Sequence, residues 1–319
     1  MKEIIRKKKM RMATEENLPF SLWITILHGI SQVILIENWV TGLLFLAAIL
    51  TTSIELGVIA FLSSAIGAGV AYLGGADPKQ IQQGLFGYNS VLTGLSVTLF
   101  LTGTFSWVIA LTGALIASLF TASMMNLFKN VGLPVLTFPF ILLTWIVLLA
   151  SYRLDTFRIT KNVVPQDLSH WQLEIAGPID WLDAFFSGIG QVFFLQGVIA
   201  GVLLFAGLFW AGWRIGLYAI AGNVVAVAGA FLLGAEHTLI DLGLYGYNAI
   251  LTVIAVGIVF KDGHHPLAPV SAMLAAFLTA PLIASVDTML LPFGLSALTM
   301  PFVICTWLFL GARKVLKRI

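Results

Sequence analysis

The chain carries the same three motifs twice, in the same order, and this duplication limits its fold more than any other feature. The pairs are GISQV at 29–33 with GIGQV at 188–192, GLFGYN at 84–89 with GLYGYN at 243–248, and LTFPF at 136–140 with LTMPF at 298–302. The first two pairs are 159 residues apart, as from Gln32 to Gln191, and the third is 162 apart, from Thr137 to Thr299. A register kept across three motifs indicates two structurally equivalent halves.

The solvent of these halves is predicted to be lipid. Hydrophobic residues make up 59% of the 319 residues and charged residues 10%, whereas about a quarter of an average soluble domain is charged. A hydrocarbon core about 30 Å thick needs roughly 20 apolar residues for each spanning helix. The expected fold class is an all-α polytopic membrane protein, with about ten transmembrane helices plus re-entrant or tilted pore helices in two inverted repeats.

Charge and the repeat divide the chain into five parts. We expect a basic N-terminus at 1–19, a first repeat at 20–151, a polar linker at 152–179, a second repeat at 180–312 and a basic C-terminus at 313–319. Lys and Arg gather at both termini, which places both in the cytoplasm and requires an even number of spans. An odd number of spans in each repeat then inverts one half against the other. Arg153, Arg158 and Lys161 argue against the expected place of the linker outside the membrane.

The basic termini also have other interpretations. An N-terminal signal peptide is disfavoured, because no short apolar core with a small-residue cleavage site follows the basic residues. The clusters suit anionic lipid or nucleic acid as well, but topology and headgroup contact explain them in a membrane protein. We therefore expect membrane lipid, and no nucleic acid, as a partner.

The repeated motifs place polar or irregular backbone within apolar sequence. Lipid tolerates such backbone only where it is buried in protein or lines a cavity. The Gly-Tyr-Asn motif is typical of a broken or re-entrant helix, and the proline of the Thr-x-Pro-Phe motif marks a helix start. The amides of Gln32 and Gln191 must be satisfied internally or face a wet path. The alternative is that the glutamines form hydrogen bonds between helices and the glycines only allow close packing.

Catalytic and metal chemistry have little support in the sequence. A phosphate-binding loop, a Gly-x-Ser-x-Gly elbow and a His-Glu-x-x-His zinc motif are all absent. His264 and His265 beside Asp262 lack the further ligands that a metal site needs, so we predict neither metal nor cofactor. Glu37 and Glu55 fall near predicted span ends. The sequence lacks the chain of buried carboxylates that a proton-coupled carrier needs. We expect passive permeation of a neutral solute and no enzyme activity.

Together, the paired motifs resemble the urea transporter family over roughly residues 20–312. The resemblance implies a channel-like facilitator with ten spans and inverted halves, located in a bacterial-type inner membrane. It also implies a homotrimer with one pore in each subunit. The pore of the family is a slot between facing aromatic and aliphatic side chains, with a ladder of oxygen atoms along one edge.

The resemblance also assigns pore roles to residues of this chain. Gln32 and Gln191 correspond to the outer urea sites, and Leu35 and Phe194 to aromatic positions of the slot. The remaining pore residues are the aromatic pair Tyr88 and Tyr247, the leucines one helical turn beyond, Leu92 and Leu251, and the midpore hydroxyls of Thr137 and Thr299. Leu35 departs from the phenylalanine of the family, which predicts a wider slot or a weaker outer site on that side. The sequence leaves open whether the two tyrosines face the lumen.

The chemistry of urea agrees with these side chains. Urea is planar and neutral, and its four N–H donors are costly to strip of water without replacement. Glutamine carbonyls and threonine hydroxyls accept such N–H groups, and ring faces contact the flat surface of the molecule. A urea channel is therefore the first hypothesis. The alternatives are a channel for another small neutral solute, such as ammonia, water or a short amide, and a non-transporting membrane scaffold.

Overall fold

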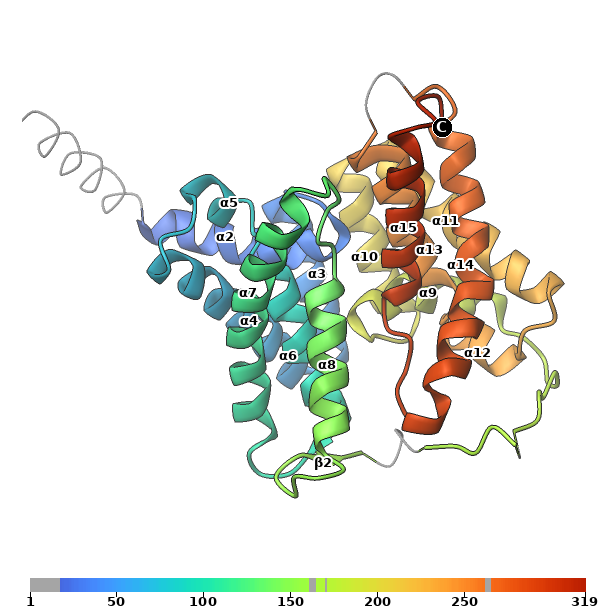
Figure 1. Ribbon diagram of the computed structural model, residues 1–319, viewed down its shortest axis with the longest axis horizontal. Helices are drawn as coiled ribbons and strands as arrows, with labels where there is room; N and C mark the ends of the chain where they lie inside the picture. Colours follow the sequence, from blue (N-terminus) through green and yellow to red (C-terminus); the bar gives the residue numbers. More distant parts are fainter. Residues whose placement is uncertain (1–17, 161–164, 170, 262–264) are drawn as a thin grey trace, which may run out of the picture.

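The structure is a computed structural model that describes residues 18–160, 165–169, 171–261 and 265–319 (Figure 1). Most of this part of the chain is helical, which confirms the all-α class. The first half contains α2 (Leu18–Ser31), the 3-10 turn η1 (Gln32–Ile34), α3 (Trp39–Thr52), α4 (Ile54–Leu73), α5 (Pro78–Gln82), α6 (Tyr88–Phe100), α7 (Ser106–Lys129) and α8 (Phe138–Ala150). The second half contains α9 (Trp181–Gly190), the turn η2 (Gln191–Phe193), α10 (Val198–Ala211), α11 (Trp213–Leu232), α12 (His237–Asp241), α13 (Gly246–Ile254), the π-helical segment η3 (Ala255–Val259), α14 (Ala268–Leu290), the turn η4 (Leu291–Phe293) and α15 (Met300–Arg313).

Equivalent helices of the two halves recur at the spacings of the repeated motifs. α3, α4 and α5 are followed 159 residues later by α10, α11 and α12, and α7 begins 162 residues before α14. The counterpart of α6 is α13 together with η3. In Figure 1, α8 runs down toward β2 while its counterpart α15 runs up toward the C-terminus, so the two halves have opposite orientations.

Helix lengths within the described residues indicate a multi-pass membrane protein. α4, α7, α11 and α14 extended by η4 are long and apolar enough to cross a membrane. Two helix pairs pass the same test only together, because α2 with η1 bends by 77° into α3, and α9 with η2 bends by 70° into α10. Three shorter apolar helices are α8, α13 with η3, and α15. The chain is therefore a multi-pass membrane protein.

Local sequence explains where these helices begin. Proline lies in the first turn of α8 (Pro139) and of α15 (Pro301), where its missing N–H has no helical partner to lose. The side chain of Asn38 accepts from Thr41 N and caps α3, and Asp180 caps α9 in the same way. The Thr-x-Pro-Phe motif thus starts a helix in both halves, as predicted.

The two halves share one hydrophobic core, in which α3 lies against α10. Thr41 Oγ1 donates to Gly207 O at 2.9 Å, and the rings of Phe45 and Phe193 lie 5.4 Å apart. A Cβ at Gly207 would lie 2.7 Å from the ring of Phe45. Small residues allow helices to approach in this way in lipid, where close packing rather than the hydrophobic effect drives association.

Two tryptophans tie each half to the other. Trp145 Nε1 of α8 donates to Ser296 O at 3.0 Å, and Trp307 Nε1 of α15 donates to Pro134 O at 2.8 Å. The two donors are repeat equivalents, and so are the two acceptors. Such reciprocal bonds relate the halves by an approximate twofold axis.

The linker runs along one end of the molecule and contacts both halves. Its segment β2 (Arg158–Ile159) pairs antiparallel with β1 (Leu101–Thr102), which follows α6. This two-residue ladder is an exception to the all-α expectation, and it forms because the linker passes the unpaired backbone where α6 ends. Further along, the carbonyl of Gly177 lies 2.7 Å from His237 Nδ1 of α12.

A buried arginine, Arg313, closes the opposite end of the molecule. Its guanidinium donates to the carbonyls of Val256, Phe260 and Ile319 at 2.8, 3.1 and 2.9 Å. Val256 lies within the π-helical segment η3 and Phe260 directly follows it, so both carbonyls belong to its last turn, where backbone acceptors lack helical partners. The helix dipole also favours a cation there. The repeat equivalent is Ser151, so only the second half has this arginine.

Some predicted features lie outside the described residues. They are the basic N-terminus up to residue 17, Lys161, and the Asp262 and His264 of the loop before α14. Within the described ranges, no group of three or more His, Cys, Asp or Glu side chains is arranged to hold a metal ion. Glu37 and Glu55 are exposed, in keeping with their predicted place at span ends.

Candidate functional site

Left-handed backbone at residues other than glycine marks the candidate site. In the described part of the chain it occurs at Leu35 (φ 59°), Leu136 (52°), Phe194 (60°) and Leu298 (50°), which form two repeat pairs. Such a conformation costs a non-glycine residue about 1–2 kcal/mol, and strain of this kind gathers at functional sites. Leu35 and Phe194 are predicted pore residues, and the other two directly precede the paired threonines.

The paired threonines meet where the two halves come together. Thr137 Oγ1 and Thr299 Oγ1 lie 2.7 Å apart, and both side chains are buried. Thr137 is the residue immediately before α8, and Thr299 is the residue immediately before α15. Because they are repeat equivalents that touch, they lie at the approximate twofold axis. One hydroxyl donates to the other, which leaves one O–H and further lone pairs unused.

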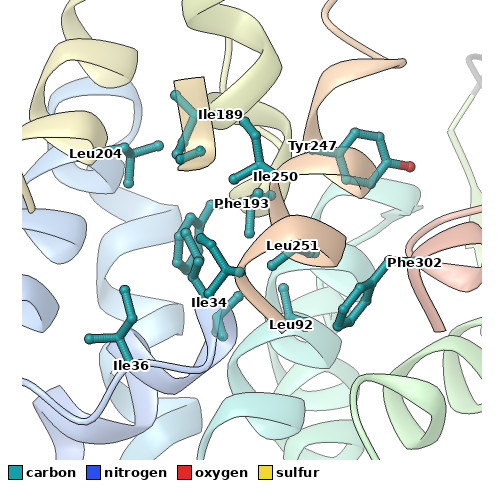
Figure 2. Close-up of a cluster of buried hydrophobic side chains, with 14 of the residues drawn as sticks. Ile34, Ile36, Leu92, Ile189, Phe193, Leu204, Tyr247, Ile250, Leu251 and Phe302 are labelled. Carbon is teal, nitrogen blue, oxygen red and sulfur yellow. The ribbon is translucent and has the colours of Figure 1, made fainter. Parts of the chain in front are cut away.

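The tyrosines of the Gly-Tyr-Asn motif bond to the backbone just before these threonines. Tyr88 Oη donates to Leu136 O at 2.7 Å, and Tyr247 Oη donates to Leu298 O at 2.5 Å. The asparagine that follows each tyrosine donates to the same carbonyl, at 3.3 Å in the first half and 3.1 Å in the second. Figure 2 shows the hydroxyl of Tyr247 directed away from Leu251. Both phenol oxygens are therefore bonded to backbone.

The predicted leucines of the pore are part of the shared core. Leu92 of α6 and Leu251 of α13 are fully buried and belong to the same hydrophobic cluster as Phe302 and Phe193 (Figure 2). They are repeat equivalents on the helices that carry the tyrosines. The cluster places aliphatic side chains from both halves around the central region.

The two glutamines differ in their bonding. Gln191 Nε2 donates to Leu242 O at 2.8 Å, which ties η2 to the residue after α12 and leaves Oε1 as the free end of the amide. Among the described residues, the Gln32 amide has no hydrogen-bond partner, and the residue is 9% exposed. His28 makes the corresponding tie from α2 to α5, with its Nδ1 2.7 Å from Gln82 O. Both ends of the Gln32 amide are thus free of partners among the described residues, whereas Gln191 has only its carbonyl oxygen free.

Phe194 lies against aromatic rings of the other half. Its ring centroid is 5.8 Å from that of Phe100, at 85°, and 6.3 Å from that of Phe140, at 71°. Edge-to-face contacts of this kind are the favoured arrangement of aromatic pairs. The repeat equivalents of these three residues are Leu35, Val259 and Phe302. The two sides of the candidate slot therefore differ in aromatic content.

A cavity of about 200 Å³ adjoins the Gln191 turn. Its lining residues are Asp180, Asp183, Ser187, Gln196, Gly197, Asp241 and Leu242. Leu242 is the residue whose carbonyl holds Gln191, so this cavity, which we term the acidic mouth, opens beside the glutamine. The first half has Ser21, Ile24 and Gln82 in place of the three aspartates. Negative charge at a mouth opposes anions and leaves a neutral solute unaffected.

Several residues that shape the site were missed by the sequence reasoning. Asn89 and Asn248 belong to the repeated Gly-Tyr-Asn motif but had no predicted role, although an amide duplicated at membrane depth indicates an obligatory hydrogen bond. The repeat did not indicate a role for Phe100 in the site, because its repeat equivalent is a valine. The tie of His28 to α5 depends on contacts that the sequence does not reveal.

Comparison with known proteins covers the whole candidate site. The family model described as Urea transporter matches residues 24–314. Urea transporter 1 of Rattus norvegicus is 28% identical over 301 residues, which covers 92% of this chain and 77% of the relative. Urea transporter 1 of Ovis aries is 27% identical over 309 residues, with the same coverage of 92% and 77%. The family model includes both copies of every motif and all the predicted pore residues, and the chain therefore belongs to the urea transporter family.

Proposed function

We propose that this member of the urea transporter family conducts urea passively and selectively through a slot-like pore at the interface of its two inverted halves. The observation that carries this mechanism is the Thr137–Thr299 hydroxyl pair at 2.7 Å. It places polar oxygen atoms within the shared apolar core, where the two halves meet. Oxygen atoms at that point replace part of the hydration that urea loses on leaving water.

The side chains of the pore divide into three kinds with separate tasks. Glutamine carbonyls accept urea N–H groups at the two ends, apolar and aromatic walls contact the flat faces of the molecule, and the threonines accept at the centre. Hydrated ions find no replacement for their water shell between such walls. All of these side chains are uncharged, which suits a neutral solute driven only by its gradient. The residues that we assign to the pore are Gln32, Leu35, Tyr88, Leu92, Thr137, Gln191, Phe194, Tyr247, Leu251 and Thr299.

Purified protein in liposomes tests this function directly. In stopped-flow light scattering, we expect proteoliposomes to take up urea faster than protein-free liposomes of the same lipid. Uptake should saturate with urea concentration and should persist without a proton or sodium gradient. Urea uptake at the lipid background would contradict the proposal. A larger increase over protein-free liposomes for ammonia, water or acetamide than for urea would support the alternative channel function instead.

The glutamines allow a sharper test within the same assay. Gln32→Ala and Gln191→Ala each remove one acceptor at an end of the pore, so each should lower urea flux about fivefold, as expected for about 1 kcal/mol. Gln191→Ala also breaks the bond to Leu242 O. Gln166→Ala in the exposed linker is the matched control. If both glutamine variants transport urea like the wild type, the amides are packing residues.

We further propose that the protein resides in the inner membrane of a bacterial-type cell, with both termini in the cytoplasm. We also propose that it assembles as a homotrimer with one pore in each subunit. The charges at the two ends support the orientation. At the linker end, Glu174, Asp180, Asp183, Glu236 and Asp241, with Asp155 and Asp167, outnumber Arg153 and Arg158, whereas the C-terminal end carries Lys129, Lys261, Lys314, Lys317 and Arg318. Basic residues favour the cytoplasmic side. A reporter fused to the C-terminus checks the orientation, and native mass spectrometry checks the trimer.

A further inference from the structure

The carbonyl oxygens of Leu136 and Leu298 have no capacity left for a solute. Each accepts one tyrosine hydroxyl and one asparagine amide hydrogen bond, and a carbonyl oxygen has two lone pairs. These carbonyls lie immediately before the central threonines in the chain. The tyrosines and asparagines therefore remove an acceptor that would otherwise stand next to the proposed urea path.

The same bonds hold a strained turn. Leu136 and Leu298 are in the left-handed region at φ 52° and 50°, where a leucine is disfavoured. The next residue in each half is the threonine before α8 or α15. Any relaxation of the leucine backbone rotates the peptide that carries its carbonyl and shifts the threonine beside it. The position of the hydroxyl pair therefore depends on the bonds to the leucine carbonyls.

From this geometry we infer that Tyr88 and Tyr247 are positioning residues, which keep the Leu136 and Leu298 carbonyls occupied so that urea passes the threonine pair without binding tightly. The inference rests on the proposed urea pore. Conduction requires that each site release its solute. A freed carbonyl at the centre adds one more acceptor for urea N–H groups, which strengthens binding and slows release.

The first half depends more on its tyrosine than the second half does. Asn248 Oδ1 accepts from Phe302 N at 3.0 Å, which gives the second half an additional bond between α13 and α15. Within the described part of the chain, Asn89 Oδ1 has no hydrogen-bond partner, and Asn89 Nδ2 donates to both Leu136 O and Thr121 Oγ1. We therefore expect the larger effect from the substitution of Tyr88.

The test is Tyr88→Phe, Tyr247→Phe and the double variant in urea-loaded proteoliposomes, with the concentration dependence of flux measured for each. Phenylalanine keeps the ring and removes only the hydroxyl. We expect the apparent KM for urea to fall about threefold to fivefold in Tyr88→Phe, as for one added hydrogen bond, and the maximal flux to fall with it. Tyr218→Phe, a half-buried tyrosine of α11 away from the motif, is the control and should keep the wild-type KM.

A structural role alone would reduce the amount of active protein and leave KM unchanged. A KM at or above the wild-type value in both phenylalanine variants overturns the inference. Should these variants fail to assemble, Asn89→Ala removes the other hydrogen bond to the Leu136 carbonyl with the tyrosine in place. A wild-type KM for urea in Asn89→Ala would then overturn the inference. A wild-type protein without urea flux would instead refute the proposed function itself.

Discussion

Replacing Thr137 and Thr299 together by valine is expected to lower urea permeability by about tenfold to a hundredfold without loss of the folded protein. Valine keeps the shape of threonine, so the buried packing around both residues is retained. The substitution removes the 2.7 Å hydroxyl pair and every side-chain acceptor that it supplies. Urea N–H groups left unpaired at the centre cost about 1–3 kcal/mol, and each 1.4 kcal/mol is about tenfold in rate. Stopped-flow uptake of urea measures the effect.

A matched pair of threonines serves as the control for this double variant. Thr98 and Thr288 each donate to the carbonyl four residues earlier in their own helix, at 2.8 and 2.7 Å. Valine at both positions should leave urea flux within about twofold, because surface and helix-internal hydroxyls are worth little. Single variants of the central pair should not be additive, since each hydroxyl is the partner of the other. Unchanged urea flux and unchanged preference over acetamide in the double variant would exclude a central role.

Gly84→Ala and Gly243→Ala are expected to prevent the protein from folding stably. Both glycines have positive φ, 77° and 74°, and both lie against the backbone of a neighbouring helix. A Cβ would be 2.4 Å from Gly29 N in the first half and 2.4 Å from Gly188 N in the second. Backbone atoms at a helix crossing cannot move aside, so the cost exceeds about 3 kcal/mol. Thermal unfolding in detergent and the yield of monodisperse protein measure it.

A second pair of glycines separates the clash from the backbone strain. Gly75 and Gly234 have the same positive φ, 74° and 77°. A Cβ at Gly75 would have nothing within 4 Å, and one at Gly234 would touch only Ile175 Cδ1 at 3.5 Å. Alanine there should cost only the left-handed strain, about 1–2 kcal/mol. If alanine at Gly75 and Gly234 lowered the stability of the protein as much as alanine at Gly84 and Gly243, the close approach of the backbones would contribute nothing to the effect.

Much of the fold was predictable because the duplicated motifs carry their own structural signals. Pro139 and Pro301 indicated the starts of α8 and α15, and both helices begin there. The shared register of Thr137 and Thr299 indicated equivalent places, and their contact follows from an approximate twofold relation between the halves. Glycine, proline and apolar runs act locally or through the repeat, so sequence reports them well.

Other features of the site depend on residues that differ between the halves. No propensity predicts a left-handed leucine, so the strained turns at Leu35 and Leu136 were not foreseen. The contrast between the free amide of Gln32 and the tied amide of Gln191 arises because His28 takes over the link to α5. Arg313 and the π-helical segment that it caps occur in one half only. These contacts join residues that are far apart in the chain, so they cannot be predicted from the spacing of motifs.

The reciprocal tryptophan bonds constrain the order in which the protein can be made. The acceptor of Trp145, Ser296 O, lies 151 residues further along the chain, and the donor to Pro134 O, Trp307, lies 173 residues further along. At a synthesis rate of about 5–20 residues per second, the first half exists for on the order of ten seconds before these two partners have been made. The two bonds therefore form only after most of the second half has been synthesised, so the first half cannot reach its final set of contacts on its own.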